Sequence, residues 1–381
     1  MQPIEFITDT LAHFVRGDDG PPPGIPAHVA PEFEQELTWL CEWHSVTAIV
    51  LSSLQKLALR PGMSRLAWAR MKALAETGAT LSRELVAAAR SLAADLDRAG
   101  IRNLLVQDVA YALTLYPLPE LRPVESIEIL VDERDWDGVI DSCARAGFTC
   151  RDNVHAFRDG AEALAYYQRF SPCLLHNPNG DRLRLRFRLF EPGSPDPAEA
   201  CWRRGGPLGE GGPAGLALED QLIASCVTHN VSRFGRLLDA VDIGLIVARR
   251  GDGIDWGYVG ERMRSRAVYA AGVLTMRHAV EVMRLPPSLV RLKSPGIVRK
   301  HLFFFLWPGM EEEFSSGSQR RQHRLRYCLL EMDGWPEKVR FMTRLFSPRR
   351  QWVEAFFGKP YSPWLKLRFV VLALRDRLGA T

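Results

Sequence analysis

The first hundred residues carry apolar side chains at helical spacing. Apolar residues recur every three or four positions over residues 33–54 and again over residues 81–96. This spacing gathers them on one face of a helix. Gly100 follows the second run, where the C-terminus of a helix favours glycine. Residues 1–100 are therefore predicted to form an N-terminal helical region, with a loop between the two runs.

The pattern changes to short β-type segments after Gly100. Ile101–Val106 is a compact apolar run, and Ile127–Val131 is β-branched and alternating, so both are predicted to be strands. A short helix is expected between them. A second helix is expected after them, capped by Asp135 and closed by Gly147.

A strong turn signal lies further along, in the sequence Asn177-Pro178-Asn179-Gly180. It separates Cys173–His176 from Leu183–Phe190, and this arrangement predicts a β-hairpin. The order strand, helix, strand, helix, hairpin predicts an α+β unit over residues 101–190, built on a small mixed sheet.

The remainder of the chain divides into two parts. Residues 191–217 are rich in proline and glycine, which is typical of a linker or surface loop. From residue 218 onward the pattern is helical, so residues 218–381 are predicted to form a C-terminal helical domain. Within it, Asp255 is expected to cap a helix.

Composition limits the classes of partner. Hydrophobic residues make up 46% of the 381 positions, as in an ordinary globular protein, and the formal net charge is only +4. This balance does not require nucleic acid or an anionic membrane as a partner. The apolar runs are too short to span a bilayer. The first sixteen residues lack the features of a signal peptide, so a cytoplasmic location is expected.

The seven cysteines are scattered and include no C-x-x-C pair, which fits neither a zinc site nor a disulfide framework. Two other polar residues have two interpretations each. His229 is interpreted as a hydrogen-bonded core histidine rather than a catalytic base. Asp242, inside an apolar helix, is interpreted as a tether to a neighbouring helix or sheet rather than an acid catalyst.

Four arginines alternate with apolar residues along the predicted hairpin. This arginine stripe consists of Arg182, Arg184, Arg186 and Arg188. Period two places the four guanidinium groups on one face of the strand, where like charges repel unless an anion neutralises them. One interpretation is a solvated face braced by Asp181, Glu125 or Glu128. The other is an anion-binding face, because arginine suits phosphate and carboxylate groups.

Several short motifs follow one another in a recognisable order. They are Leu104–Tyr116, Arg122–Val131, Arg184–Leu189, Leu218–Leu222, Leu238–Ile243 and Ile254–Trp256. Their order resembles a family of uncharacterised bacterial nucleotidyltransferases distantly related to polymerase β. In that family a Leu-Leu-Lys-Gly turn and helix are followed by an Arg-Pro loop. An Asp-Ile-Asp pair then lies on a strand that ends in Leu-Leu-Val.

The resemblance implies two divalent cations held by carboxylates, two on one strand and one on its neighbour. The corresponding residues here are Ser126, Glu128 and Arg184, and the Lys-Gly turn corresponds to Gln107-Asp108. A hydroxyl and a guanidinium thus replace two of the three carboxylates. The site is expected to be catalytically degenerate, with no metal cofactor, or with magnesium at Glu128 if the protein is active.

The resemblance therefore predicts a protein that binds an anionic or nucleotide-like small molecule, or a partner protein. By the same correspondence, the predicted ligand-binding residues are Gln107, Asp108, Arg122, Arg184 and Arg186. Two alternatives remain at this stage. The protein could be an active metal-dependent nucleotidyltransferase with an unknown acceptor, or a structural scaffold in a biosynthetic complex.

Overall fold

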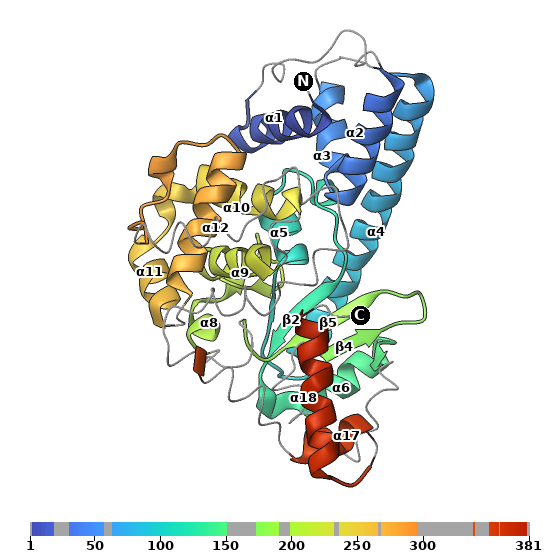
Figure 1. Cartoon of the computed structure of the whole chain (residues 1–381), viewed down its shortest axis with the longest axis vertical. Helices are drawn as coiled ribbons and strands as arrows, with labels where there is room; N and C mark the ends of the chain where they lie inside the picture. The colour runs from blue at the N-terminus through green and yellow to red at the C-terminus, as the bar shows by residue number, and fades with distance from the viewer. Residues whose placement is uncertain are drawn as a thin grey trace.

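The computed structural model confirms the predicted α+β class, with one mixed sheet surrounded by helices (Figure 1). The residues that it describes are 2–18, 30–56, 63–150, 173–189, 199–231, 236–265, 268–295, 338–339, 350–357 and 359–378.

The described part of the sheet has seven strands in the order β3-β4-β5-β2-β1-β7-β6. Their bounds are β1 Asn103–Leu105, β2 Ile127–Val131, β3 Thr149–Cys150, β4 Cys173–His176, β5 Arg182–Arg186, β6 Gly206–Pro207 and β7 Ala214–Gly215. β2 pairs with β5, and β1 with β7, in parallel, whereas the other neighbours are antiparallel. The sheet is therefore mixed, as the order of predicted elements implied.

The predicted strands are present with adjusted ends. β2 has the predicted bounds, and β1 is shorter than the predicted Ile101–Val106. The predicted hairpin is confirmed: β4 and β5 pair, and Gly180 takes a φ of 89° in the turn between them. β5 ends at Arg186, and Phe190 at the end of the predicted strand lies outside the described residues.

Part of the predicted linker belongs to the sheet. Residues 199–217 include the helix α8 (Glu199–Arg204) and the two short strands β6 and β7. Leu105 of β1 pairs with Gly215, so this segment extends the sheet beyond β1. Glycine at position 215 leaves room for the side chain of Leu208, since a Cβ atom on Gly215 would lie 2.5 Å from Leu208 Cδ2.

The N-terminal region consists of α1 (Pro3–Arg16), α2 (Pro31–Trp43), α3 (Thr47–Lys56) and α4 (Arg65–Arg98). The apolar run over residues 33–54 is two helices instead of one, because the chain turns at Ser45, which has a φ of 55°. The predicted loop before residue 81 is wrong from Arg65 onward. Alanine, leucine, methionine, lysine and glutamate favour helix there even without a clear apolar stripe.

Between β1 and β3 lie α5 (Asp108–Thr114), the 3₁₀ turns η1 (Pro119–Leu121) and η2 (Glu133–Asp135), and α6 (Trp136–Arg145). Asp135 occupies the N-cap position of α6, but its side chain makes no capping bond there. Asp132 caps instead, since its Oδ1 accepts from Arg134 N at 3.0 Å to start η2. Gly147 ends the helix with a φ of 84°, as predicted.

The C-terminal helices are α9 (Leu218–Val231), α10 (Leu237–Arg250), α11 (Trp256–Ser265), α12 (Tyr269–Val282), α17 (Arg350–Phe357) and α18 (Pro363–Leu378), with 3₁₀ turns η3 (Gly251–Gly253) and η4 (Pro287–Leu289). The predicted cap of α11 is confirmed. Asp255 Oδ1 accepts from Tyr258 N at 2.9 Å.

Two hydrophobic clusters hold the described elements together. One lies between the sheet and the helices α4 and α6, and includes Leu92, Ile127 and Leu185. The other joins α1–α3 to α9–α12 around α10. The two helical regions thus share one core, although they lie at opposite ends of the sequence.

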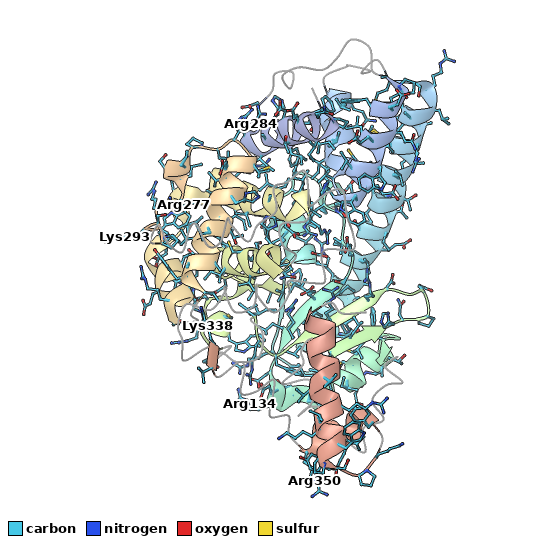
Figure 2. The ribbon with its side chains drawn as sticks, viewed as in Figure 1. Arg134, Arg277, Arg284, Lys293, Lys338 and Arg350 are labelled. Atoms are coloured by element: carbon cyan, nitrogen blue, oxygen red, sulfur yellow. The ribbon has the colours of Figure 1, made fainter. Side chains whose placement is uncertain are left out.

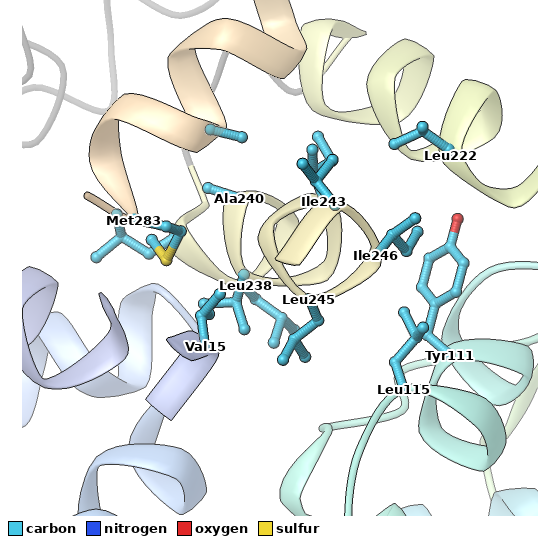
Figure 3. Packing of buried hydrophobic residues seen from close by; sticks show 14 of the residues in the cluster. Val15, Tyr111, Leu115, Leu222, Leu238, Ala240, Ile243, Leu245, Ile246 and Met283 are labelled. Carbon is cyan, nitrogen blue, oxygen red and sulfur yellow. The ribbon is translucent and has the colours of Figure 1, made fainter. Parts of the chain in front are cut away.

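α10 occupies the centre of the shared cluster, with Val15 of α1 and Met283 on one side and Tyr111 of α5 on another (Figure 3). Gly244 of α10 permits the close packing. A Cβ atom there would lie 2.9 Å from Met283 Cγ and 3.2 Å from Val15 Cγ1. A larger side chain at position 244 would therefore force α1 away from α10.

Charged side chains lie over the surface of this assembly. The labelled basic residues are spread from Arg284, near α1, to Arg350 in α17 at the opposite end of the molecule (Figure 2). Among the described helices, none combines the length and apolar character needed to cross a membrane.

Candidate anion-binding site

Alternation along β2 determines what lies on each face of the sheet. Ile127, Ile129 and Val131 belong to the cluster beneath α4 and α6. Glu128 and Leu130 point to the opposite face. Leu130 joins the helical core there, whereas Glu128 lies beside β5, where the face is polar. The site therefore forms where the apolar cover of the sheet ends.

Glu128 is held by two arginines of the stripe. Its side chain is only 2% exposed. Arg184 Nη1 donates to Glu128 Oε1 at 3.1 Å, and Arg186 Nε donates to Oε2 at 2.6 Å. Each carboxylate oxygen of Glu128 thus accepts a charge-assisted hydrogen bond from one arginine of the stripe.

Gln107 approaches the same carboxylate from the β1–α5 turn. In the amide orientation that satisfies both neighbours, Nε2 donates to Glu128 Oε1 and Oε2 at 3.2 and 3.1 Å, and Oε1 accepts from Thr228 Oγ1. The backbone of Gln107 is strained, with a φ of 54° and a ψ of −124°. The glycine-favouring conformation of this turn therefore falls on Gln107, not on Asp108 as the resemblance implied.

The other two arginines of the stripe have different environments. Arg188 Nη2 lies 3.3 Å from Glu133 Oε1. Arg182 is exposed at the start of β5, opposite His176 of β4. Of the three carboxylates that the sequence suggested as partners of the stripe, Glu128 is the one that contacts its middle two arginines, Arg184 and Arg186.

Ser126 lies directly before β2 and is buried, with 1% of its surface exposed. Glu125, one residue earlier, has separate partners: Arg236 Nη2 lies 2.9 Å from its Oε1, and Ser45 Oγ donates to that oxygen at 3.4 Å. Glu125 and Glu128 are therefore engaged by different groups, as expected for side chains on opposite faces of an extended chain.

Arg122 and Asp108, two of the predicted ligand-binding residues, belong to a buried ionic network. Arg122 Nε and Nη2 donate to Asp242 Oδ1 and Oδ2 at 3.2 and 2.7 Å, and Nη2 lies 3.0 Å from Asp108 Oδ1. Tyr116 Oη also donates to Asp242 Oδ1 at 2.8 Å. The ligand role of Arg122 and Asp108 stays a prediction, and the geometry gives both residues a structural role.

Electrostatics within this network follow from burial. Burial would lower the pKa of Arg122, but the carboxylates of Asp108 and Asp242 outweigh it and raise that pKa well above its usual value. Burial raises the pKa of Asp242 against the opposing effect of Arg122. Asp242 therefore acts as a tether between α10 and the loop before β2, as the sequence interpretation favoured.

His229 is buried in α9 with 1% exposure. Its Nδ1 lies 3.6 Å from Asp239 Oδ2, and its ring stacks on His278 with centroids 6.1 Å apart. Burial, with His229 nearby, lowers the pKa of His278 to about 3. The position fits the core histidine that the sequence suggested.

The residues at Glu128 do not fit a pair of divalent cations. A hard cation requires several carboxylate or carbonyl oxygens, and here the single carboxylate is bonded to two arginines. Among the described residues, no three histidine, cysteine, aspartate or glutamate side chains gather as metal ligands. The donors present favour an anion over a cation.

Sequence reasoning missed the partners contributed by α9 and α10. Thr228 and Asp242 come within reach of Gln107 and Arg122 only through packing between segments more than a hundred residues apart. The sequence offers one indication of the Arg122–Asp242 pair. Asp242 is a charged residue within an apolar helix, so it needs a charged or polar partner.

Comparison with known proteins gives one match. A family model described as "Uncharacterised nucleotidyltransferase" matches residues 31–284, which is more than half of the chain and includes every residue of the Glu128 site. Neither the curated proteins nor the solved structures contain a match.

Proposed function

This chain belongs to the uncharacterised nucleotidyltransferase family, and on that premise we propose that it binds an anionic, nucleotide-like ligand without two-metal catalysis. The ligand would contact the outer edges of Arg184 and Arg186. Glu128 and Gln107 would hold those side chains in place, and a phosphorylated group would supply the second anion.

The pairing of Glu128 with two arginines carries this proposal. A guanidinium has five N–H donors, and the hydrogen bonds to Glu128 engage one nitrogen of Arg184 and one of Arg186. The side chain of Arg184 remains 34% exposed and that of Arg186 19% exposed. Arg184 can therefore accept a second anion on its open side while Glu128 holds its inner side.

The same pairing argues against magnesium-dependent transfer. A dication would have to displace both arginines from Glu128 and then lose most of its water for one carboxylate. Ser126 supplies a hydroxyl where the family resemblance expects a second carboxylate. We therefore propose that the site is catalytically degenerate.

The test uses ATP and tripolyphosphate as probes, titrated into the full chain in a chelating buffer and then in magnesium. The expected result is binding in both buffers. Arg184→Ala should weaken binding roughly ten- to a hundredfold, since a charge-assisted hydrogen bond is worth about 1.5–3 kcal/mol. The matched control is Arg65→Ala, an exposed arginine at the start of α4.

Two outcomes would overturn the proposal. One is equal affinity of the wild type and Arg184→Ala for both probes. The other is magnesium-dependent release of pyrophosphate from ATP that Glu128→Gln abolishes, which would show an active nucleotidyltransferase.

A further inference from the structure

A hollow lies at the C-terminal end of α10, and its volume is about 410 Å³. Its lining includes Leu218, Val247, Arg249, Arg250, Asp252 and Leu289. They come from the start of α9, the end of α10, and the turns η3 and η4. The volume is within the range of small-molecule sites.

Two consecutive arginines in this hollow have no carboxylate partner among the described residues. Arg249 Nη1 donates to the carbonyl oxygen of Leu115 at 3.0 Å, and its guanidinium lies over the ring of Phe14, 5.8 Å from the centroid. Arg250 is exposed. The one carboxylate in the lining, Asp252, is paired with Arg291 at 2.6 Å.

The surroundings of Arg249 favour an added anion. Its side chain is exposed, so a negative group beside it can form a charge-assisted hydrogen bond. The negative end of the α10 dipole opposes an anion here, so the attraction must come from the two arginine side chains that line the hollow.

Apolar side chains form the rest of the lining. Val247 is buried, and Leu218 and Leu289 are half-buried. A ligand that covers Leu218 and Leu289 would remove apolar surface from water, which is favourable. The site thus combines an apolar wall with cationic groups at one end.

We propose that this hollow binds a small organic carboxylate with an apolar body, the carboxylate facing Arg249 and Arg250. The proposal is independent of the function proposed at Glu128. Leu218 and Thr228 are ten residues apart on α9, which corresponds to about 15 Å along the helix. The hollow is therefore a separate site.

The test titrates 4-phenylbutyrate and its neutral amide into the full chain by calorimetry. The expected result is that the carboxylate binds at least tenfold more tightly than the amide. Arg250→Gln should weaken carboxylate binding about tenfold, and Arg250→Glu should weaken it further, with unchanged melting temperatures because this side chain is exposed. Arg65→Gln and Arg184→Ala should bind as the wild type does.

Absence of carboxylate binding would overturn the proposal. So would equal binding of acid and amide, or wild-type affinity in Arg250→Glu. Loss of binding in Arg184→Ala would place the probe at the Glu128 site and would also refute a site on α10. Because tripolyphosphate reports on Arg184 and phenylbutyrate on Arg250, either proposal can fail without the other.

Discussion

Arg184 on β5 lies directly opposite Glu128 on β2, and its Nη1 is 3.1 Å from the Oε1 of that carboxylate. The parallel register of the two strands brings these residues together. The family resemblance expects a third carboxylate at position 184, but the residue there is the counter-ion of the remaining carboxylate. The arginine at this position pairs with Glu128, and by the resemblance it occupies the place of a metal ligand.

We predict that magnesium does not bind tightly at Glu128. Two arginines already satisfy the carboxylate, and dehydration of a small dication requires more than one acidic ligand. Calorimetry with magnesium chloride should give the same heats for the wild type and Glu128→Gln. A magnesium isotherm that disappears in the variant would contradict this prediction.

Arg184→Lys should recover only part of the tripolyphosphate affinity that Arg184→Ala loses. Lysine keeps the charge but lacks the planar fork that can contact Glu128 and a phosphate at once. Titration of the three proteins should rank them wild type, lysine, alanine. Wild-type affinity in the lysine variant would show that charge alone is sufficient.

Asp242→Asn should destabilise the protein by about 1.5–3 kcal/mol, because the buried guanidinium of Arg122 loses one of its two carboxylate partners and keeps only Asp108. Denaturant unfolding measures the change. Asp252→Asn is the matched control, since it breaks the exposed ion pair between Asp252 of η3 and Arg291 and should change stability little. Equal effects of the two substitutions would show that the Arg122–Asp242 pair is not a structural tether.

His278 should make stability fall in acid. Its pKa is about 3 in the folded protein against the ordinary 6.5, so the folded state binds fewer protons than the unfolded state below pH 6.5. Above pH 6.5 the titration of this histidine does not affect the free energy of unfolding. Below it, the free energy of unfolding declines as pH falls toward 3, by up to about 1.4 kcal/mol per pH unit. His278→Gln should flatten the pH dependence of unfolding between pH 6.5 and 4.5. Parallel curves for the two proteins would contradict this assignment.

Local patterns predicted the elements that carry the Glu128 site. The alternation over Ile127–Val131 determines which side chains are buried, and the turn through Gly180 places the arginine stripe on a hairpin. Both signals act within a few residues. The placement of Glu128 and Arg184 on one face was not a local signal. It came from the order of the motifs, which resembles that of a known family.

Other features depend on contacts that no local pattern contains. The helix from Arg65 buries only Met71 before residue 81, and the sequence predicts a loop over this first part. Thr228 and Asp242 reach the β1–α5 turn and Arg122 only through tertiary packing. The strands β6 and β7 have a proline- and glycine-rich sequence, and they form because the edge of β1 is there to pair with them.

The contact of α1 with α10 across Gly244 has a consequence for synthesis on the ribosome. α1 ends at Arg16, and its partner begins at Leu237, more than two hundred residues later. At about 5–20 residues per second, the apolar face of α1 waits roughly ten to forty seconds for the helix that covers it. During that interval a nascent chain exposes Val15, which packs against Gly244 of α10, so its yield in a cell depends on how well that part of α1 is shielded before α10 emerges.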